Sequence, residues 1–329
     1  MVQINLSRAG TVFVALFITS IAEASWSSQG STTTVVQNST DLLCSRLNNE
    51  GCGKRFYDKE FPIDSRLFEH PWIVRFGYKR DDNVTYVFQG ALIHELYVVT
   101  TVFVTQFDSF GRLTYVRLGE YNSSTENDCS LLSEQGETCA PPAQDIMVDA
   151  VIIHPEYNMF RQVNNIALVQ MRTPANVNGL SVLPICINQQ NQAEDSLLLI
   201  SSWCGSKETG LSLIPKQYMM KRISPKDCTN LLSTYTLNLE DGIFCIIFKQ
   251  EHVPQDNTEY APSLRGSAGG LVYSVQSEGK VYLIGLLSYG PPYPAKLGEP
   301  YIVTSIAPFY NWLTEMIKSR INTQCTTTN

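Results

Sequence analysis

Short apolar runs separated by turn-forming residues fill most of this sequence from about residue 70 onward, and no other feature constrains its fold more. The runs are rich in Val, Ile, Leu, Phe and Tyr, and examples span residues 72–78, 85–93, 97–101, 114–121, 166–171, 196–203, 243–248, 270–275, 281–290 and 301–306. No helical periodicity lies between them. The pattern therefore predicts an all-β barrel or sandwich.

One helical signal closes the chain. Apolar residues recur there at i, i+3, i+4, i+7 and i+8 and form a single stripe, made of Phe309, Trp312, Leu313, Met316 and Ile317. Pro308 stands near the start of this stretch, where a missing N–H costs no hydrogen bond. We therefore expect a C-terminal amphipathic α-helix after the strands.

The N-terminus has the pattern of a secretory signal peptide over residues 1–24. Arg8 gives the basic region, the apolar run at 11–22 is too short to span a bilayer, and small residues at 22 and 24 mark a cleavage site before Ser25. Residues 25–51 begin with a Ser/Thr-rich stretch and are interpreted as a linker. No later segment is apolar enough to span a membrane, so we expect a secreted, extracellular protein.

Cysteines and glycosylation sequons agree with export. The chain has nine cysteines, which form disulfides in an oxidising compartment, and the odd number leaves at least one thiol free or paired with another chain. Sequons of the form N-x-S/T lie at Asn38, Asn83 and Asn122. The net charge of −7 argues against nucleic acid or an anionic membrane as the main partner.

Several local motifs occur in the order found in the trypsin/chymotrypsin-like serine proteases, and the chain resembles that family. The segments "HPWIV" (70–74), "GALIHELYVVTTVFV" (90–104), "NNIALVQM" (164–171), "LPICI" (183–187), "GSAGGLV" (266–272) and "SYG" (288–290) resemble the family's PWMV, GSLI…YVLTAAHC, NDIALLRL, PICL, GDSGGPL and SWG. The resemblance implies an all-β fold of two packed six-stranded antiparallel β-barrels with a C-terminal α-helix. The domain is expected to span residues 52–329.

A finer resemblance links residues 116–158 to the arthropod CLIP-domain proteases and their homologues. In that group a small disulfide closes an inserted loop, which here implies a Cys129–Cys139 bond. The CLIP module itself, normally six cysteines, is absent, because only Cys44 and Cys52 precede the barrel region.

The catalytic residues of the family fall on unsuitable side chains in this sequence. The position of the histidine base is Phe103, that of the aspartate is Asn165, and that of the nucleophilic serine is Ala268. The triad needs a hydroxyl nucleophile, a base to remove its proton, and a carboxylate to orient the base. The resemblance therefore implies a pseudo-protease rather than an enzyme.

Other family features differ in the same direction. The aspartate that pairs with a cleaved N-terminus falls on Ser267, and no R-IVGG motif precedes "PW", where residues 58–72 read "DKEFPIDSRLFEHPW". The specificity-pocket carboxylate of trypsins falls on Pro262. An alternative frame makes Ser267 the nucleophile, with His94 or another of the four histidines as an improvised base, although none of them lies at the family's base position.

The resemblance also implies which cysteines pair. Besides Cys129–Cys139, it implies Cys52–Cys186 and Cys228–Cys245, and it leaves Cys44, Cys204 and Cys325 without an assigned partner, so one of them is open to an intermolecular bond. Family bridges that are missing here fall on apolar residues: Phe88 with Val104, and Leu264.

We expect no metal and no cofactor. The acidic candidates for a Ca²⁺ site are Glu120, Glu134 and Glu137, and oxygen ligands must converge to bind that ion.

The preferred interpretation is a secreted, non-catalytic serine protease homologue that binds other secreted proteins and regulates an extracellular protease cascade. The resemblance suggests haemolymph and arthropod innate immunity, including prophenoloxidase activation and melanisation. Two alternatives stay open: an active serine hydrolase with a rearranged catalytic centre, and an extracellular adhesive or developmental protein on the same fold. Function depends on sites rather than on folds, so these roles follow from analogy.

Overall fold

The computed structural model describes residues 47–48, 50–57, 60–133, 136–161, 163–190, 193, 197–206, 210–232, 242–253, 260–292 and 294–326. The predicted signal peptide at 1–24, most of the predicted linker at 25–51, and with it Asn38 and Cys44, lie outside the described residues.

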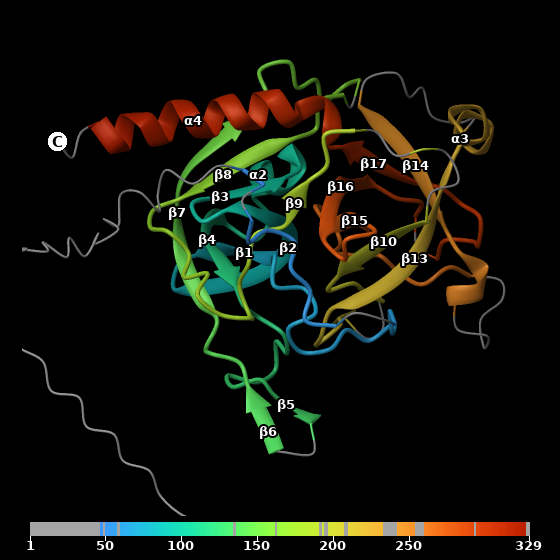
Figure 1. Cartoon of the computed structure of the whole chain (residues 1–329). Coiled ribbons are helices and arrows are strands. Elements are labelled where there is room, and N and C mark those ends of the chain that lie inside the picture. Colours follow the sequence, from blue (N-terminus) through green and yellow to red (C-terminus); the bar gives the residue numbers. More distant parts are fainter. Residues whose placement is uncertain are drawn as a thin grey trace, which may run out of the picture. The chain divides into compact units, whose positions relative to one another are not determined.

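Six antiparallel strands close into a first barrel (Figure 1), in the order β1-β2-β3-β8-β7-β4. Their bounds are β1 Ile73–Arg80, β2 Asn83–His94, β3 Tyr97–Thr100, β4 Arg112–Leu118, β7 Gln144–Ile153 and β8 Ala167–Met171. The barrel interior is filled by apolar side chains such as Val74, Phe76, Leu92 and Val169, which are fully buried. Alternation of side chains along each strand puts one set inward and leaves the other set for the outer face.

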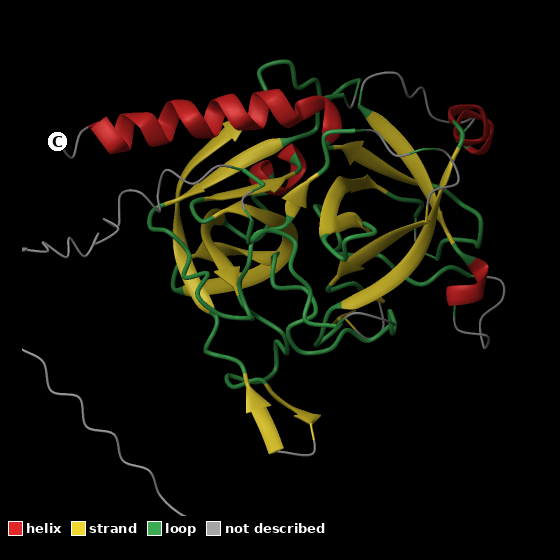
Figure 2. Ribbon diagram, viewed as in Figure 1, coloured by secondary structure: helices red, strands yellow, loops and turns green. Residues whose placement is uncertain are grey.

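A second set of six strands closes in the order β15-β10-β13-β14-β17-β16, because β16 also pairs with β15. The bounds are β10 Leu197–Ser202, β13 Lys216–Ile223, β14 Ile243–Phe248, β15 Leu271–Val275, β16 Val281–Tyr289 and β17 Tyr301–Ser305. The short strand β9 (Cys186–Ile187) adds to this barrel in parallel with β16. The prediction of two six-stranded antiparallel barrels is therefore confirmed (Figure 2).

The barrels and the terminal helix share one buried cluster. It contains Trp72 and Ile93 from the first barrel region, Leu271 and Leu283 from the second, and Leu313 from helix α4 (Tyr310–Thr326). This helix follows a 3₁₀ turn, η2 (Ala307–Phe309), and lies beside β7 and β8 in Figure 1. The predicted stripe faces the protein, since Phe309, Leu313 and Ile317 are buried and Trp312 and Met316 are partly buried against the same cluster.

The remaining elements are short. They are α2 (Val102–Gln106), α3 (Pro225–Leu231), η1 (Gln250–His252), the pair β11 (Gly205–Ser206) and β12 (Gly210–Leu211), and the hairpin of β5 (Cys129–Ser133) and β6 (Gly136–Cys139). The hairpin projects away from the barrels (Figure 1). Among the described residues, none of the helices is both long enough and apolar enough to cross a lipid bilayer.

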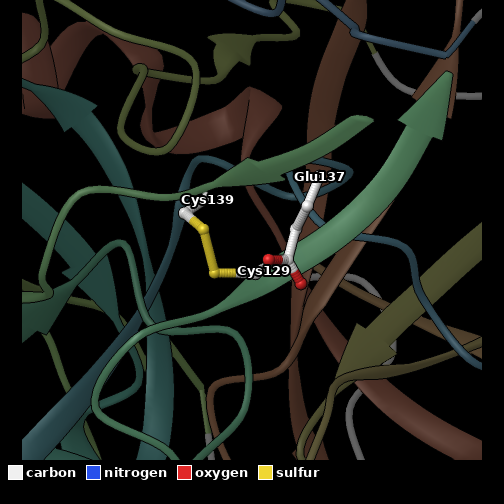
Figure 3. Close-up of side chains that lie close together, drawn as sticks. All are labelled: Cys129, Glu137 and Cys139. Carbon is white, nitrogen blue, oxygen red and sulfur yellow. A yellow bond between two sulfur atoms is a disulfide. The ribbon is translucent and has the colours of Figure 1, made fainter. Parts of the chain in front are cut away.

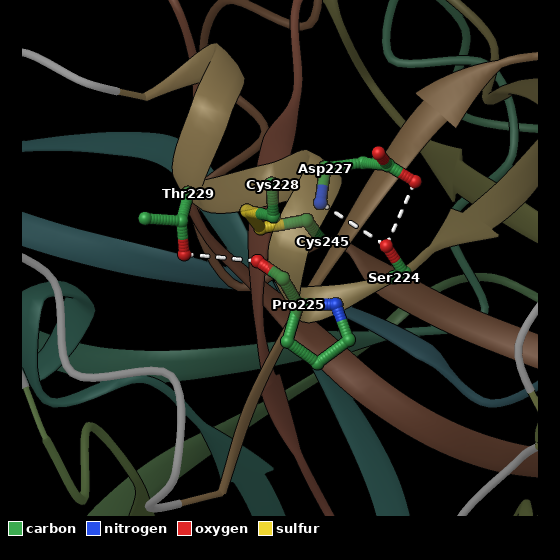
Figure 4. Close-up of a disulfide and its surroundings, with 6 residues drawn as sticks. All are labelled: Ser224, Pro225, Asp227, Cys228, Thr229 and Cys245. Atoms are coloured by element: carbon green, nitrogen blue, oxygen red, sulfur yellow. Dashed lines mark hydrogen bonds between the residues drawn. A yellow bond between two sulfur atoms is a disulfide. The ribbon is translucent and has the colours of Figure 1, made fainter.

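Three disulfides join the pairs that the resemblance implied: Cys52–Cys186, Cys129–Cys139 and Cys228–Cys245. The first ties the segment before the barrels to β9. The third links α3 to β14, where Ser224 caps the helix by accepting from the backbone N of Asp227 at 3.1 Å (Figure 4). Such bonds stabilise a fold largely by restricting its unfolded chain, by about 2–4 kcal/mol each.

Candidate functional site

A pocket of about 380 Å³ opens between the two barrels and is lined by two of the three residues expected at the family's catalytic positions. Phe103 comes from the first barrel, and Ala268 comes from the loop that precedes β15 of the second. Ser288 and Tyr289, at the end of β16, line the same pocket. Asn165 does not line it but contacts Ser288 from the buried side. The fold thus brings together residues that lie far apart in the sequence.

Phe103 lies on the short helix α2 and leaves 40% of its side chain exposed. Its ring packs edge-on against Phe88, with the centroids 5.5 Å apart, and lies 5.4 Å from Phe107. Phe88 and Val104 stand where the family has a disulfide, and both are buried in the core of the first barrel. A phenyl ring has no atom that exchanges a proton, so Phe103 offers the pocket an apolar surface.

Asn165 is buried, with 1% of its surface exposed, just before β8. Its Oδ1 accepts from the backbone N of Val102 at 2.9 Å, and its Nδ2 donates to Ser288 Oγ at 3.3 Å. Ser288 Oγ in turn lies 2.6 Å from Thr304 Oγ1. The amide therefore satisfies its buried polar atoms as a neutral group, at the boundary of the two barrels.

The loop around Ala268 is held against the first barrel by its backbone. Gln89 N donates to Ala268 O at 3.0 Å, and Gly269 N donates to Leu287 O at 3.0 Å. Gly269 has φ +74°, and a Cβ built there would lie 2.0 Å from Gln89 O. Only glycine fits this close approach, which explains why the "GG" of the motif is present although its serine is not.

Ser267 is fully buried, at 0% exposure, and its Oγ lies 2.6 Å from Ser202 Oγ. Of the histidines with described side chains, His70 Nε2 bonds Ser65 Oγ, His94 Nδ1 accepts from Leu96 N, and His154 Nδ1 accepts from Glu156 N. None of these three bonds reaches Ser267, and the side chain of His252 lies outside the described residues.

The floor of the pocket carries no carboxylate among the described residues. Pro262, expected at the position of the trypsin aspartate, is half-buried and does not line the pocket, whereas its neighbours Ser263 and Leu264 do. Tyr301 and Ala295 close the far side and are buried. Burial raises the pKa of the Tyr301 hydroxyl well above its usual value, so this hydroxyl stays neutral. Among the described residues that line the pocket, the one charged side chain is that of Arg265, so the lining offers no counter-charge to a basic group.

A polar cluster before β1, in which Glu69 and Gln217 are buried and Asp64 is exposed, was not predicted from the sequence. Arg66 Nη2 pairs with Glu69 Oε1 at 3.1 Å, and Gln217 Nε2 donates to the same oxygen at 3.0 Å. Tyr273 donates to Gln217 Oε1 at 3.1 Å, and Asp64 pairs with Lys216 of β13. The segment 64–69 is thus fixed to the second barrel by polar contacts. The charges in "DSRLFEH" were its only sequence signal.

The calcium candidates do not converge in the described part of the chain. Glu120 pairs with Arg117 at 3.2 Å, Glu137 is exposed on β6, and Glu134 lies outside the described residues. The one described group with three potential ligand atoms is Cys129, Glu137 and Cys139 (Figure 3). Both of its sulfurs are in a disulfide, so they cannot bind a metal as thiolates.

Two of the sequons lie in the described residues. Asn83 is exposed at the start of β2. Asn122 is half-buried, and its Oδ1 accepts from Ser124 N at 3.1 Å and from Ser124 Oγ at 2.7 Å. Cys204 is the one free cysteine among the described residues and is buried, whereas the side chain of Cys325 is not described.

Comparisons with known proteins agree with this architecture. The sequence model of the trypsin family matches residues 64–313. The CLIP domain-containing serine protease HP8 of Bombyx mori is 28% identical over 84% of this chain and 73% of its own length. Melanization protease 1 of Drosophila melanogaster is 26% identical over 82% of this chain and 68% of its own length. The crystal structure of the Drosophila Grass clip serine protease of the Toll pathway superposes with a TM-score of 0.69 at 20% identity, over 83% of this chain and 76% of the other, and shows the likeness of fold.

Proposed function

Because this chain belongs to the trypsin family, its chemistry depends on three positions, and we propose from the residues found there that it is a secreted, non-catalytic homologue that binds other proteins of an extracellular protease cascade. The observation that carries the proposal is the trio Phe103, Asn165 and Ala268 around one cleft. Without a hydroxyl at 268 there is no nucleophile, and without an imidazole at 103 there is no base to activate one.

The buried environment of Ser267 supports the same proposal. A nucleophile must reach a carbonyl carbon, whereas Ser267 is fully buried and its Oγ lies against Ser202 Oγ. No titratable described side chain is hydrogen-bonded to it. A rearranged hydrolase would require this loop to change its conformation so that the Ser267 hydroxyl becomes accessible to a substrate.

The cleft supports a binding role because the fold keeps it open. Its volume of about 380 Å³ lies within the range of sites that hold ligand groups, and loops on a rigid scaffold are where binding residues concentrate. We propose that proteins of a melanisation cascade are the partners, on the basis of similarity to proteins named CLIP domain-containing serine protease HP8 and melanization protease 1. Secretion into an arthropod body fluid such as haemolymph is part of the same proposal.

A fluorophosphonate probe tests the absence of catalysis, because it labels only an activated serine. The purified protein is incubated with the probe beside active trypsin, and we expect no label on this chain. Labelling that disappears in Ser267→Ala would show a rearranged hydrolase and overturn the proposal.

Affinity capture from the native body fluid, followed by reconstitution, tests the partners. We expect cascade proteases or their homologues on the immobilised protein, and a change in the rate at which the purified cascade activates prophenoloxidase when the protein is added. Binding to matrix components alone, with no effect on the cascade, would favour an adhesive or developmental protein.

A further inference from the structure

Five aromatic rings gather beside the cleft, on the first barrel. Phe88 contacts Phe107 at 4.9 Å and Tyr78 at 6.0 Å between centroids, and Phe107 contacts Phe110 at 5.3 Å. Phe103 completes the group through its contacts with Phe88 and Phe107. Phe110 leaves 39% of its side chain exposed and Phe103 leaves 40%. Exposed aromatic side chains that gather in this way mark interaction surfaces more often than single exposed residues do.

A groove of about 510 Å³ runs along this group. Its lining includes Phe88, Phe107 and Phe110, together with Leu211 of β12 and Gly266 of the loop before β15. We call this the aromatic groove. Its walls are held in place locally, because a Cβ at Gly266 would lie 2.5 Å from Leu211 Cδ2 and Gly205 N donates to Arg265 O at 3.2 Å.

Phe88 stands at a strained position between the aromatic groove and the cleft, and it lines both. The register of β1 with β2 shifts between Arg75 and Phe76, which leaves Phe88 unpaired in a bulge with φ +58°. A bulky residue with positive φ is an outlier, and such strain concentrates at binding sites, where the surrounding structure holds it. The bulge turns the Phe88 ring toward the other aromatic side chains.

Arg265 is the sole charged residue among those that line the cleft or the aromatic groove in the described part of the chain. It lines both, and it is exposed. Its backbone is fixed, since Ser263 Oγ accepts from Arg265 N at 3.2 Å, but its guanidinium has no ion pair or hydrogen bond to the described residues. An unpaired guanidinium between two apolar hollows is complementary to a carboxylate flanked by apolar groups.

We propose that the aromatic groove and the neighbouring cleft together bind an exposed segment of a partner protein in which an Asp or Glu stands between apolar side chains. The carboxylate pairs with Arg265, one apolar side chain lies against Phe107 and Phe110, and the other enters the cleft beside Phe103. Aromatic side chains, phenylalanine included, and arginine are enriched in protein–protein interfaces. This proposal rests on the proposed function, since it names the chemistry of the partner that a non-catalytic homologue would bind.

A phage-displayed library of random linear peptides, panned on the intact protein, tests the proposal. We expect enriched sequences with an acidic residue between apolar ones, and their synthetic peptides to bind in a fluorescence polarisation assay. Arg265→Glu is expected to weaken the binding of these acidic peptides by about tenfold or more. The same variant is expected to bind peptides whose acidic residue is replaced by Lys, because the charge pair is then reversed. Phe110→Ser is expected to weaken the binding of both peptide types.

Phe160→Ser and Arg161→Glu are the matched controls. Phe160 is 90% exposed and Arg161 is exposed, and neither lines the cleft or the aromatic groove. Binding should be unchanged in both. No enrichment, enriched sequences without the acid, or binding that Arg265→Glu leaves intact would overturn the proposal.

Sedimentation of the intact protein tests whether a second copy of the chain, rather than a partner protein, occupies the aromatic groove. A dimer that Phe110→Ser dissociates would show that a second copy of the chain covers the groove, and the proposed partner segment would then be wrong. The peptide-binding and sedimentation results do not depend on fluorophosphonate labelling. The proposal for the aromatic groove and the proposal of a non-catalytic protein can therefore fail independently of each other.

Discussion

The amide nitrogen of Asn165 lies 3.3 Å from Ser288 Oγ, while its oxygen accepts from Val102 N at 2.9 Å. One neutral side chain thereby joins the start of α2 in the first barrel to the end of β16 in the second. Both of its polar ends are bonded at a site with almost no exposure. The buried position that we expect to correspond to the family's aspartate is therefore satisfied by an uncharged side chain.

Asn165→Asp should destabilise the protein at neutral pH, by about 1–3 kcal/mol, because a buried carboxylate replaces a satisfied amide and no imidazolium lies beside it. Burial raises the pKa of the introduced carboxyl, so the protonated form, which donates to Ser288 as the amide does, is favoured in the folded state. The deficit relative to the natural sequence should shrink as the pH falls below that raised pKa. Urea unfolding of both proteins at neutral and acidic pH measures it, and an equal deficit at both would contradict the explanation.

Ser267→Asp should lower the free energy of unfolding more than Ser267→Ala does. The serine hydroxyl lies 2.6 Å from Ser202 Oγ with no exposed surface, so alanine costs about 1 kcal/mol for one lost hydrogen bond. Aspartate places a charge there with no cationic partner in the described surroundings, at a cost of about 3 kcal/mol or more. Thermal unfolding of the two variants orders them, and equal melting temperatures would show that a counter-charge reaches this site.

His70 should make the folded state sensitive to mild acid. Its Nε2 lies 2.9 Å from Ser65 Oγ, and burial lowers its pKa to about 4, opposed by the Glu69 carboxylate and reinforced by the charges of Arg55 and Arg66. The folded state therefore favours the neutral ring: the stabilisation is complete above the unfolded pKa of about 6.5 and is lost as the pH falls toward 4.

The difference in unfolding free energy between the natural protein and His70→Gln isolates this contribution, since the other groups titrate in both. We expect the difference to change by up to about 3 kcal/mol between pH 7 and pH 4. Parallel curves over that interval would show that the ring stays accessible to water.

Cys204 should be unreactive in the folded protein. It is buried and unpaired, and burial raises the pKa of its thiol to about 11, so little thiolate forms near neutral pH. Iodoacetamide should label it only after denaturation, as mass mapping without reduction would reveal. If the chain forms a disulfide-linked dimer, Cys204→Ser should leave that dimer intact, because Cys44 and Cys325 then remain as the cysteines without an assigned partner. Loss of the dimer would place the thiol at an interface.

Strand prediction succeeded where apolar runs reflect burial on both faces. All of β3 and β8 is buried, and both are obvious in the sequence. Strand β7 instead alternates between half-buried or buried positions and exposed ones, and β13 mixes lysines with methionines, so neither stands out as an apolar run. Their pairing with β8 and β14 fixes them as strands, and this pairing is a property of the closed barrel.

The sequence by itself determined the fold class, the terminal helix and the family resemblance, because strand pattern, helical period and ordered motifs are local features of the chain. Only the tertiary structure decided that Asn165 is satisfied through Ser288, that Ser267 is enclosed with Ser202, and that Arg265 is the one charged residue among the described residues that line the aromatic groove. Each of these contacts joins segments that are distant in the sequence and come together only when the two barrels pack. Burial and hydrogen bonding at such contacts depend on distances in three dimensions, which the local sequence does not contain.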